Sequence, residues 1–247
     1  MIRTTLRAAA VATTVAVAGL VAGQAHAALY TVTTTGTISY GYDSGEFGNI
    51  GYLGGKTYKL TETFNSNGAS AYTGGSYYGG DYTYLYGSPD VTVTATIGGK
   101  SATIDIPINY GNELYLSNSA GQSYSYYWWY YYSGIDQIYS YANGPSKDGT
   151  KYYSAQQSVY SYSDKFVPTL DLGQSISHDV NFLDYAGDYF YSYDYTNGRE
   201  TYFSGTPTTI ALNAAAAVPE PASFALLGTG LAGIGLFGRR KRNTNGR

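Results

Sequence analysis

Hydrophobic and polar residues alternate along most of residues 28–217, and no segment of this region repeats with the period of a helix. In residues 56–64, Tyr58, Leu60 and Glu62 share one face of the expected strand, and threonines and Lys59 occupy the other. Turn signals recur roughly every 8–12 residues. The pattern predicts an all-β fold, a β-sandwich of about ten to twelve antiparallel strands. Further strands are expected at residues 30–40, 91–97, 101–108, 188–195, 199–203 and 208–212.

Two pairs of these segments are expected to form hairpins. Gly98-Gly99 is a short turn between residues 91–97 and 101–108, and the isoleucines of the second segment are expected to face Val91, Val93 and Ala95 across the core. Thr196-Asn197-Gly198 joins the second pair, where Asn-Gly favours positive φ. No internal repeat of constant period is present, which argues against a solenoid.

Tyrosine is the unusual feature of the composition: the chain has 31, all between residues 28 and 217. The densest run, residues 124–132, reads as one strand with aromatic side chains on both faces. It provides a candidate aromatic contact surface, made of Tyr126, Trp128, Trp129 and Tyr130. Exposed rings with hydroxyls at their rim suit stacking on sugars or contact with proteins. The alternative is that aromatic residues simply favour strands and pair across them.

The N-terminal end has the three parts of a secretory signal. Arg3 and Arg7 precede an uncharged apolar stretch, and Ala25-His26-Ala27 is a small-x-small cleavage site. We therefore predict a signal peptide over residues 1–27, forming a helix before signal peptidase cuts it from the exported chain. The alternative is an uncleaved anchor helix.

The C-terminal end combines three elements in order. Val218, Pro219, Glu220 and Pro221 come first, and residues 222–238 carry no charge. As a helix these would span about 25 Å, short of the roughly 30 Å hydrocarbon core. The basic cluster that follows would stay on the cytoplasmic side, and consists of Arg239, Arg240, Lys241 and Arg242. The chain thus divides into a domain over 28–213, a linker over 214–217, a sorting segment over 218–242 and a polar tail over 243–247.

This C-terminal arrangement closely resembles the PEP-CTERM sorting signal of proteins that are exported by Gram-negative bacteria making extracellular polysaccharide. The resemblance implies processing by an exosortase, a membrane cysteine transpeptidase that recognises Pro-Glu-Pro, with a transient transmembrane helix in the inner membrane and a final place at the cell surface or outside the cell. Residues 36–38, 43–48 and 53–64 are also similar to the opening strands of many uncharacterised PEP-CTERM proteins, which supports the fold and implies no activity.

Charge and cysteine content exclude several functions. Seven of the 14 bases but one of the 17 acids (Glu220) lie in the two ends, so the region between has 16 acidic and seven basic residues, a formal charge of −9. Nucleic-acid binding, which needs clustered Lys and Arg, is therefore not expected. The absence of cysteine excludes thiol catalysis, disulfides and Cys-ligated zinc. No cofactor is expected.

No catalytic or metal site emerges from the sequence. His178 is the sole histidine after the signal and has no nucleophile elbow near it. Asp184, Asp188 and Asp194 are spaced so that a glycosidase-like pair is conceivable, although acids this frequent give such spacing by chance. Calcium is conceivable at residues 43–46 or 184–188, where solvated turn acids are the alternative. Residues 31–33 and 92–94 are isolated Thr-Val-Thr runs, which does not favour the regular threonine array needed to bind ice.

The sequence thus predicts a non-enzymatic surface or matrix protein that contacts extracellular polysaccharide or surface proteins in a biofilm. A self-associating structural surface protein is the first alternative and a polysaccharide hydrolase the second.

Overall fold

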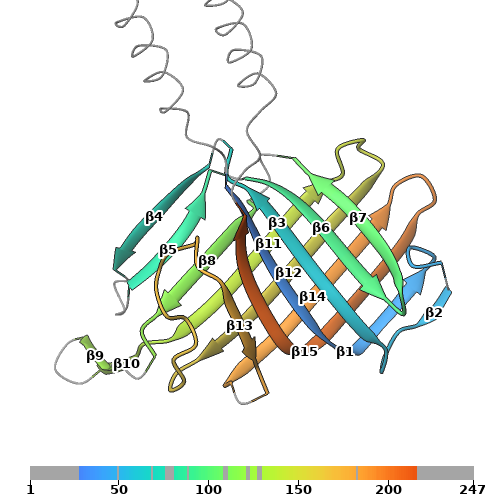
Figure 1. Ribbon diagram of the computed structural model, residues 1–247. Coiled ribbons are helices and arrows are strands. Elements are labelled where there is room, and N and C mark those ends of the chain that lie inside the picture. Colours follow the sequence, from blue (N-terminus) through green and yellow to red (C-terminus); the bar gives the residue numbers. More distant parts are fainter. Residues whose placement is uncertain are drawn as a thin grey trace, which may run out of the picture. The chain divides into compact units, whose positions relative to one another are not determined.

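The computed structural model describes residues 28–48, 50–67, 69–75, 81–87, 89–107, 111–120, 123–126, 130–181 and 183–215 (Figure 1). All regular structure in these ranges is β, in the order β1 (Leu29–Ser44), β2 (Ile50–Tyr52), β3 (Thr57–Asn65), β4 (Ser70–Gly75), β5 (Asp81–Tyr86), β6 (Asp90–Ile97), β7 (Lys100–Ile106), β8 (Glu113–Asn118), β9 (Ser123–Tyr126), β10 (Tyr130–Ser133), β11 (Asp136–Pro145), β12 (Lys151–Ser161), β13 (Ile176–Asp179), β14 (Tyr185–Asp194) and β15 (Arg199–Ala215). The described part of the chain contains no helix long and apolar enough to cross a membrane.

The strands form one long antiparallel sheet and a separate hairpin of β9 and β10. The order in the sheet is β4-β5-β8-β11-β12-β14-β15-β1-β3-β6-β7, with β13 also paired to β15 and β2 to β1. The antiparallel all-β prediction is confirmed. The structure differs from the predicted sandwich in one respect. The strands of both layers are joined through hydrogen bonds into a single bent sheet.

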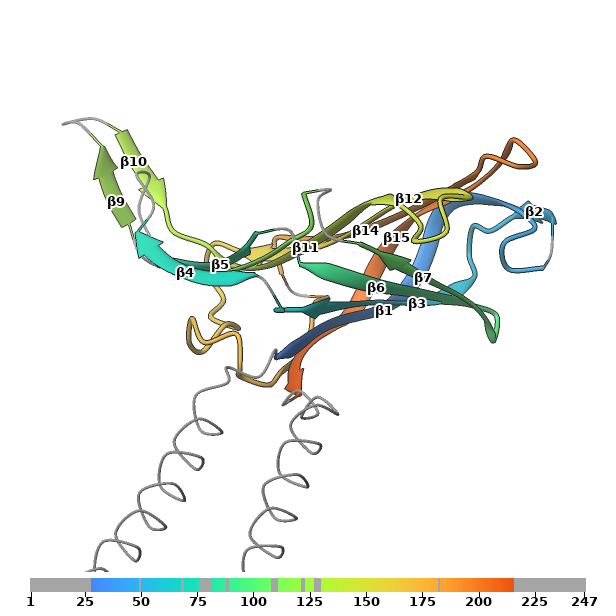
Figure 2. The same cartoon turned by 90° about the horizontal axis from the view of Figure 1, so that it is seen from above.

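Two long strands, β1 and β15, run through both layers. Residues 199–205 of β15 pair with β14, whereas residues 209–212 pair with β13. Likewise, residues 29–37 of β1 pair with β3, whereas residues 42–44 pair with β2. The first layer consists of β4, β5, β8, β11, β12 and β14, together with the beginning of β15, the end of β1 and β2. The second layer consists of β13, the end of β15, the beginning of β1, and β3, β6 and β7. Figure 2 shows the layers meeting along β1 and β15.

The bend occurs where the two long strands are in close contact. Their pairing shifts register between Thr35 and Gly36 and again between Ile38 and Tyr40. A Cβ on Gly36 would lie 2.2 Å from the carbonyl oxygen of Thr206, and one on Gly205 would lie 2.5 Å from the Tyr58 ring. Glycine is therefore required at the bend for packing reasons.

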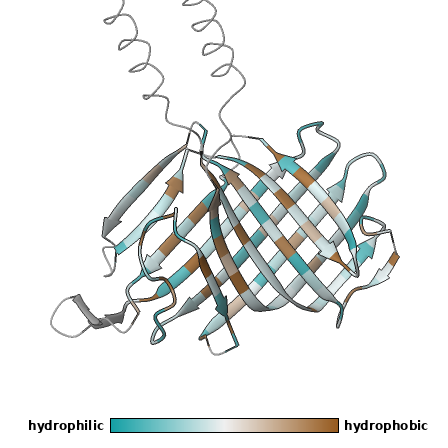
Figure 3. Ribbon diagram, in the orientation of Figure 1, coloured by the Kyte–Doolittle hydropathy of each residue, from teal (hydrophilic) through white to brown (hydrophobic). Residues whose placement is uncertain are grey.

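The inner faces of the two layers form one core. Apolar and polar positions alternate along the strands in Figure 3, and the inward positions include Val32, Leu60 and Phe64, all fully buried. Phe190 and Phe203 stack with their ring centroids 5.4 Å apart. Glu62 lies on this inner face, as the alternation of residues 56–64 predicts, and is completely buried.

The predicted hairpin around Gly98-Gly99 is confirmed. Ile97 pairs with Lys100, and the two glycines have φ of 58° and 80°, which is the geometry of a two-residue type I′ turn. The expected packing of its strands is wrong, because Val91 pairs with Ile106 within the same sheet. Neighbouring strands of a hairpin present their apolar residues to the same side, so these residues lie side by side.

Two other expectations need correction. Residues 124–132 are not one strand, since Tyr126 of β9 pairs with Tyr130 of β10 and the chain reverses between them. Alternation does not reveal such a reversal when every position favours a strand. The expected linker also begins within a strand, because Ala214 and Ala215 of β15 pair with Tyr30 and Leu29. The predicted signal peptide, the rest of the linker, the sorting segment and the polar tail lie outside the described residues.

The outer face of the second layer is covered with threonine. Thr31 and Thr33 of β1 lie opposite Thr63 and Thr61 of β3, with 3.2 Å between the hydroxyl oxygens of each pair. On the next strands Thr94 of β6 pairs with Thr103 of β7, with their hydroxyl oxygens 3.0 Å apart. The Thr-Val-Thr runs that are isolated in the sequence are therefore neighbours in space, because β3 lies between β1 and β6. Thr31 and Thr33 hydrogen-bond to threonines of β3, whereas Thr92 and Thr94 bond to Asp105 and Thr103 of β7.

Candidate functional site: the tyrosine face and the rim pocket

The outer face of the first layer is covered with tyrosine. Alternate residues of its strands point into the core, as Leu85, Leu116 and Phe190 do, so the residues between them point outward. The strand register then joins tyrosines from distant parts of the sequence into rows. One row contains Tyr72, Tyr84, Tyr115 and Tyr139, and another contains Tyr191, Tyr202, Tyr42 and Tyr52. We call this surface the tyrosine face.

Its most exposed part lies near the bend, where β1, β2 and β15 meet. Tyr40 and Tyr52 are 57% and 60% exposed, and their ring centroids are 6.1 Å apart in an edge-to-face arrangement. The Tyr40 ring lies 5.7 Å from that of Tyr202, and the two hydroxyl oxygens are 3.1 Å apart. We call Tyr40, Tyr42, Tyr52 and Tyr202 the Tyr40 cluster. The cluster presents both ring surface and hydroxyl groups to solvent.

Two tyrosines of this face, Tyr139 and Tyr202, have raised pKa values. Partial burial raises the pKa of Tyr139, and the nearby Glu113 carboxylate raises it further. The pKa of Tyr202 is raised by its hydrogen bond to Tyr40 and by desolvation. These two hydroxyls therefore keep their protons at neutral pH, and each can both donate and accept hydrogen bonds.

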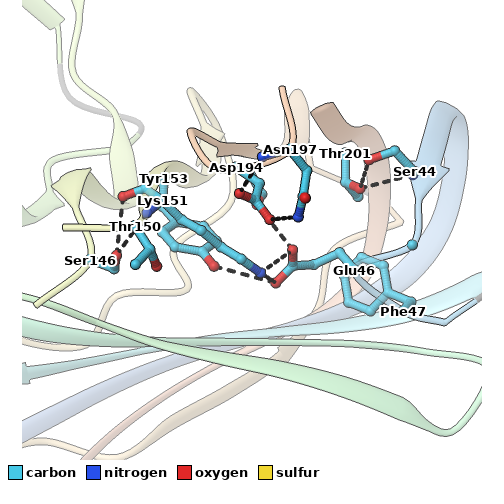
Figure 4. A network of polar contacts seen from close by, with 12 residues as sticks. Ser44, Glu46, Phe47, Ser146, Thr150, Lys151, Tyr153, Asp194, Asn197 and Thr201 are labelled. Carbon is cyan, nitrogen blue, oxygen red and sulfur yellow. Dashed lines mark hydrogen bonds and ion pairs between the residues drawn. The ribbon is translucent and has the colours of Figure 1, made fainter. Parts of the chain in front are cut away.

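A polar pocket of about 260 Å³ opens at the rim of the first layer, where β1, β12, β14 and β15 end. Glu46 is at its centre and accepts two hydrogen bonds from the Lys151 ammonium, of 2.7 and 2.9 Å (Figure 4). Tyr153 and Ser192 also donate to the Glu46 carboxylate, each at 3.3 Å. The remaining lining residues are Ser44, Gly45, Asp194, Asn197 and Arg199.

The charges in this rim pocket balance. Partial burial lowers the pKa of Lys151, but the ion pair with Glu46 raises it by more, so this pKa is raised overall. Hydrogen bonds from Asn197 lower the pKa of Asp194, which thus stays ionised. Burial raises the pKa of Tyr153 to about 12. Arg199 lines the same pocket, and its guanidinium has no hydrogen-bond or ion-pair partner among the described residues. A neutral, hydroxyl-rich ligand matches such a mixture of donors and acceptors.

The predicted aromatic contact surface is only partly described. Tyr126 and Tyr130 are paired through their backbones in the β9–β10 hairpin, and Trp128 and Trp129 lie outside the described residues. In the strand expected over residues 188–195, Tyr189, Tyr191 and Tyr193 share the outer face of β14. The rest of the tyrosine face could not be predicted, because it depends on pairing between segments far apart in the sequence.

The structure does not bring the three candidate acids together. Asp188 points into the core, and Asp194 is six residues further along the same strand, about 20 Å away at the rise of a strand. Asp184 accepts hydrogen bonds from Ser161 and from the backbone amide of Tyr162, both at 2.7 Å. The separation of about 5–9.5 Å that glycoside hydrolysis needs is not met by Asp188 and Asp194.

The other candidates have structural partners. His178 packs against Phe166, with ring centroids 5.5 Å apart. In the suggested calcium loop, Asp43 accepts hydrogen bonds from the backbone amides of Gly45 and Phe47, so its oxygens act as turn acceptors. Within the described ranges, no group of three or more His, Cys, Asp or Glu residues is arranged to hold a metal ion.

Comparison with known proteins identifies one segment. Residues 217–242 match the PEP-CTERM protein-sorting motif, which contains the Pro219-Glu220-Pro221 sequence and the basic cluster. The motif indicates a surface protein sorted by an exosortase, and implies export and membrane-anchored sorting. No curated protein matches the chain. The tyrosine-rich domain therefore has to be interpreted from its own geometry.

Proposed function

We propose that the protein is a non-enzymatic component of the bacterial surface whose tyrosine face contacts extracellular polysaccharide in a biofilm. In this proposal signal peptidase and an exosortase process the two ends, and a transient helix anchors the chain in the inner membrane until the sorting segment is cut. The observation that supports this proposal is that strand pairing aligns tyrosines into rows on the outer face of the first layer. Sugar rings stack on aromatic rings through their C–H faces, and tyrosine hydroxyls at the rim of the rings can bond the sugar hydroxyls.

The preorganisation of the rings favours this function. Rings fixed by a sheet lose little conformational entropy when a ligand binds. The Tyr40 cluster combines high exposure with neighbouring rings, and the rim pocket adds charged and amide groups on the same layer. A long polymer crossing several strands would contact many tyrosines at once, so weak individual contacts would add to a useful avidity.

The first test is binding of the full-length chain, purified in detergent, to the exopolysaccharide of its own host. We expect the Tyr40→Ser/Tyr52→Ser variant to bind about tenfold more weakly for each ring that contributes about 1.4 kcal/mol. The matched control changes the opposite face, with Thr94→Ser/Thr103→Ser, and is expected to bind like the wild type. Equal binding by both variants would exclude the Tyr40 cluster from the contact surface.

Two further arms separate the alternatives. Trp128→Ala/Trp129→Ala tests the predicted aromatic surface, which stays a prediction, and lowered affinity would add it to the binding surface. Release of reducing ends from the polymer would identify a hydrolase and contradict the proposal.

Self-association is a second candidate that one observation favours. β4 lies at the end of the sheet order, and its residues Ser70–Gly75 include no charge and no proline. Such an edge can pair with a strand of another chain. The other edge strand, β7, carries Lys100 and Asp105, which oppose pairing with a copy of itself.

A further inference from the structure

The centre of the core contains a group of polar residues that the tyrosine face does not explain. Ser140 of β11, Gln157 of β12 and Asp188 of β14 lie directly opposite one another in consecutive strands, so they form one row on the inner face of the first layer. Glu62 of β3 faces this row from the second layer. All four residues are at most 4% exposed.

Neighbouring contacts fix the direction of two of these side chains. The Gln157 amide nitrogen donates to the backbone carbonyl of Val32, at 3.3 Å, so its carbonyl oxygen points away from that contact. Asp188 accepts hydrogen bonds at Oδ2 from the hydroxyls of Thr34 and Tyr58, the latter at 2.6 Å. Its second oxygen, Oδ1, has no partner.

Oxygen atoms without partners converge here. Both oxygens of Glu62 and Oδ1 of Asp188 are buried without a hydrogen-bond partner, and so are the Gln157 carbonyl and the Ser140 hydroxyl. Ser140 and Gln157 lie close enough to lower the Glu62 pKa, yet no bond of ordinary length and angle forms. When the two carboxyl groups are ionised, the only protons available to these oxygens are those of the Ser140 hydroxyl and the second N–H of the Gln157 amide, so acceptors outnumber donors. No lysine, arginine or histidine is buried anywhere in the described residues.

We propose that this group is a calcium site, in which the carboxylates of Glu62 and Asp188, the Gln157 carbonyl and the Ser140 hydroxyl bind one ion between the two layers. Buried charges in proteins are paired or coordinate metals. Calcium takes carboxylate, carbonyl and hydroxyl oxygens in a flexible geometry, and two carboxylates neutralise its charge. No sulfur or imidazole ligand is present to favour a softer metal.

The surrounding residues support this assignment. Thr34 and Tyr58 hold the Asp188 carboxylate in place, as residues behind a metal ligand commonly do. The ion would join β3 of one layer to β11, β12 and β14 of the other, which is the role that disulfides fill in many exported domains, and this chain has no cysteine. Calcium sites of extracellular modules typically have a Kd of about 10⁻⁴–10⁻³ M.

The experiment uses the full-length chain in detergent, unfolded and refolded in chelator to empty the core, then dialysed against calcium chloride. We expect about one calcium per chain by elemental analysis. Calcium at a hundredfold excess over its Kd is expected to raise Tm by about 5–10 °C. Glu62→Gln should abolish both effects, and the matched surface variant Glu113→Gln should retain them.

A second measurement covers the case in which Glu62→Gln fails to fold. Terbium bound at this position in the wild type is expected to luminesce through energy transfer from Tyr58, whose hydroxyl bonds a ligand, and excess calcium should displace it. No retained calcium, together with a Tm that chelator leaves unchanged, would show that the carboxyl groups are neutralised by protons and would overturn the proposal. Calcium binding that survives in a folded Glu62→Gln variant would also overturn it, by placing the ion elsewhere.

Discussion

The two buried carboxyl groups, those of Glu62 and Asp188, have pKa values well above their ordinary ones. Burial raises the pKa of Glu62 to about 8, and the nearby Asp188 contributes to this rise. Burial likewise raises the pKa of Asp188 to about 7, against hydrogen bonds from Thr34 and Tyr58 that lower it. Without a cation, both groups are therefore protonated in the folded protein at pH values where they are ionised in the unfolded chain.

This difference predicts how stability depends on pH in calcium-free buffer. Among the described residues, Glu62 and Asp188 lie close to each other, and Tyr58 hydrogen-bonds to Asp188 in the core. Tyr139 lies on the opposite face of β11, near enough for the Glu62 charge to contribute to its raised pKa. Between about pH 4 and pH 8 the folded state binds more protons than the unfolded state, so the free energy of unfolding falls as pH rises. Urea unfolding in chelator at pH 5 and pH 8 should show a loss of several kcal/mol.

A matched variant tests whether Glu62 causes this pH dependence. The Glu62→Gln variant has no titratable group at this position, so its free energy of unfolding should change less between pH 5 and pH 8 than that of the wild type. An equal slope in both proteins would mean that other groups produce the pH dependence. Calcium at a millimolar concentration should weaken the decline, because the metal favours the ionised carboxylates.

The alternation of residue types predicts well which face of a strand a side chain occupies. The alternation in residues 56–64 places Glu62 on the inner face, and the structure confirms this. The sequence does not show that Ser140, Gln157 and Asp188 lie beside one another, since their row depends on the register of three strands separated by turns and loops. A buried acid can therefore be predicted from sequence, whereas the residues that surround it cannot.

At the scale of single elements, the bend of β1 and β15 determines the architecture. Gly36 and Gly205 allow the backbones and the Tyr58 ring to approach so closely that a Cβ would overlap with them. The register shifts at Gly36 and Tyr40 are the points where one sheet becomes two layers. Sequence alternation predicts the strands on both sides of such a point but not the change of direction between them.

This geometry predicts that Gly36→Ala is strongly destabilising. Its Cβ would lie 2.2 Å from the Thr206 carbonyl oxygen, and backbone atoms cannot move aside without breaking the pairing of β1 and β15. We expect a loss of about 2–3 kcal/mol in the free energy of unfolding, measured in urea. Gly75→Ala is the control, since its Cβ would have only an ordinary contact of 3.6 Å with Asp81. A Gly36→Ala protein as stable as this control would contradict the close packing at the bend.

On the scale of the domain, the two outer faces differ in chemistry although they belong to one sheet. The first layer presents tyrosine, and the second presents threonine pairs whose hydroxyls bond to each other. The sequence shows that the chain is rich in both residues but not that they are separated onto opposite faces. Residues 124–132 illustrate the reason, because the same alternation fits one strand or the hairpin of β9 and β10.

The behaviour of the β4 edge distinguishes two functions, polysaccharide binding by single chains and assembly of several copies of the chain. If β4 pairs with β4 of another chain, the apparent mass of the detergent-purified protein should rise with concentration in sedimentation experiments. Ala71→Lys adds a charge to this exposed edge and is expected to prevent the rise without changing polysaccharide binding, because Ala71 is remote in the sheet order from the Tyr40 cluster. Thr103→Lys on β7 is the matched control and should assemble like the wild type. A concentration-independent monomer would leave the tyrosine face as the functional surface, whereas loss of polysaccharide binding in Ala71→Lys would mean that assembly through β4 is itself required for the polymer to bind.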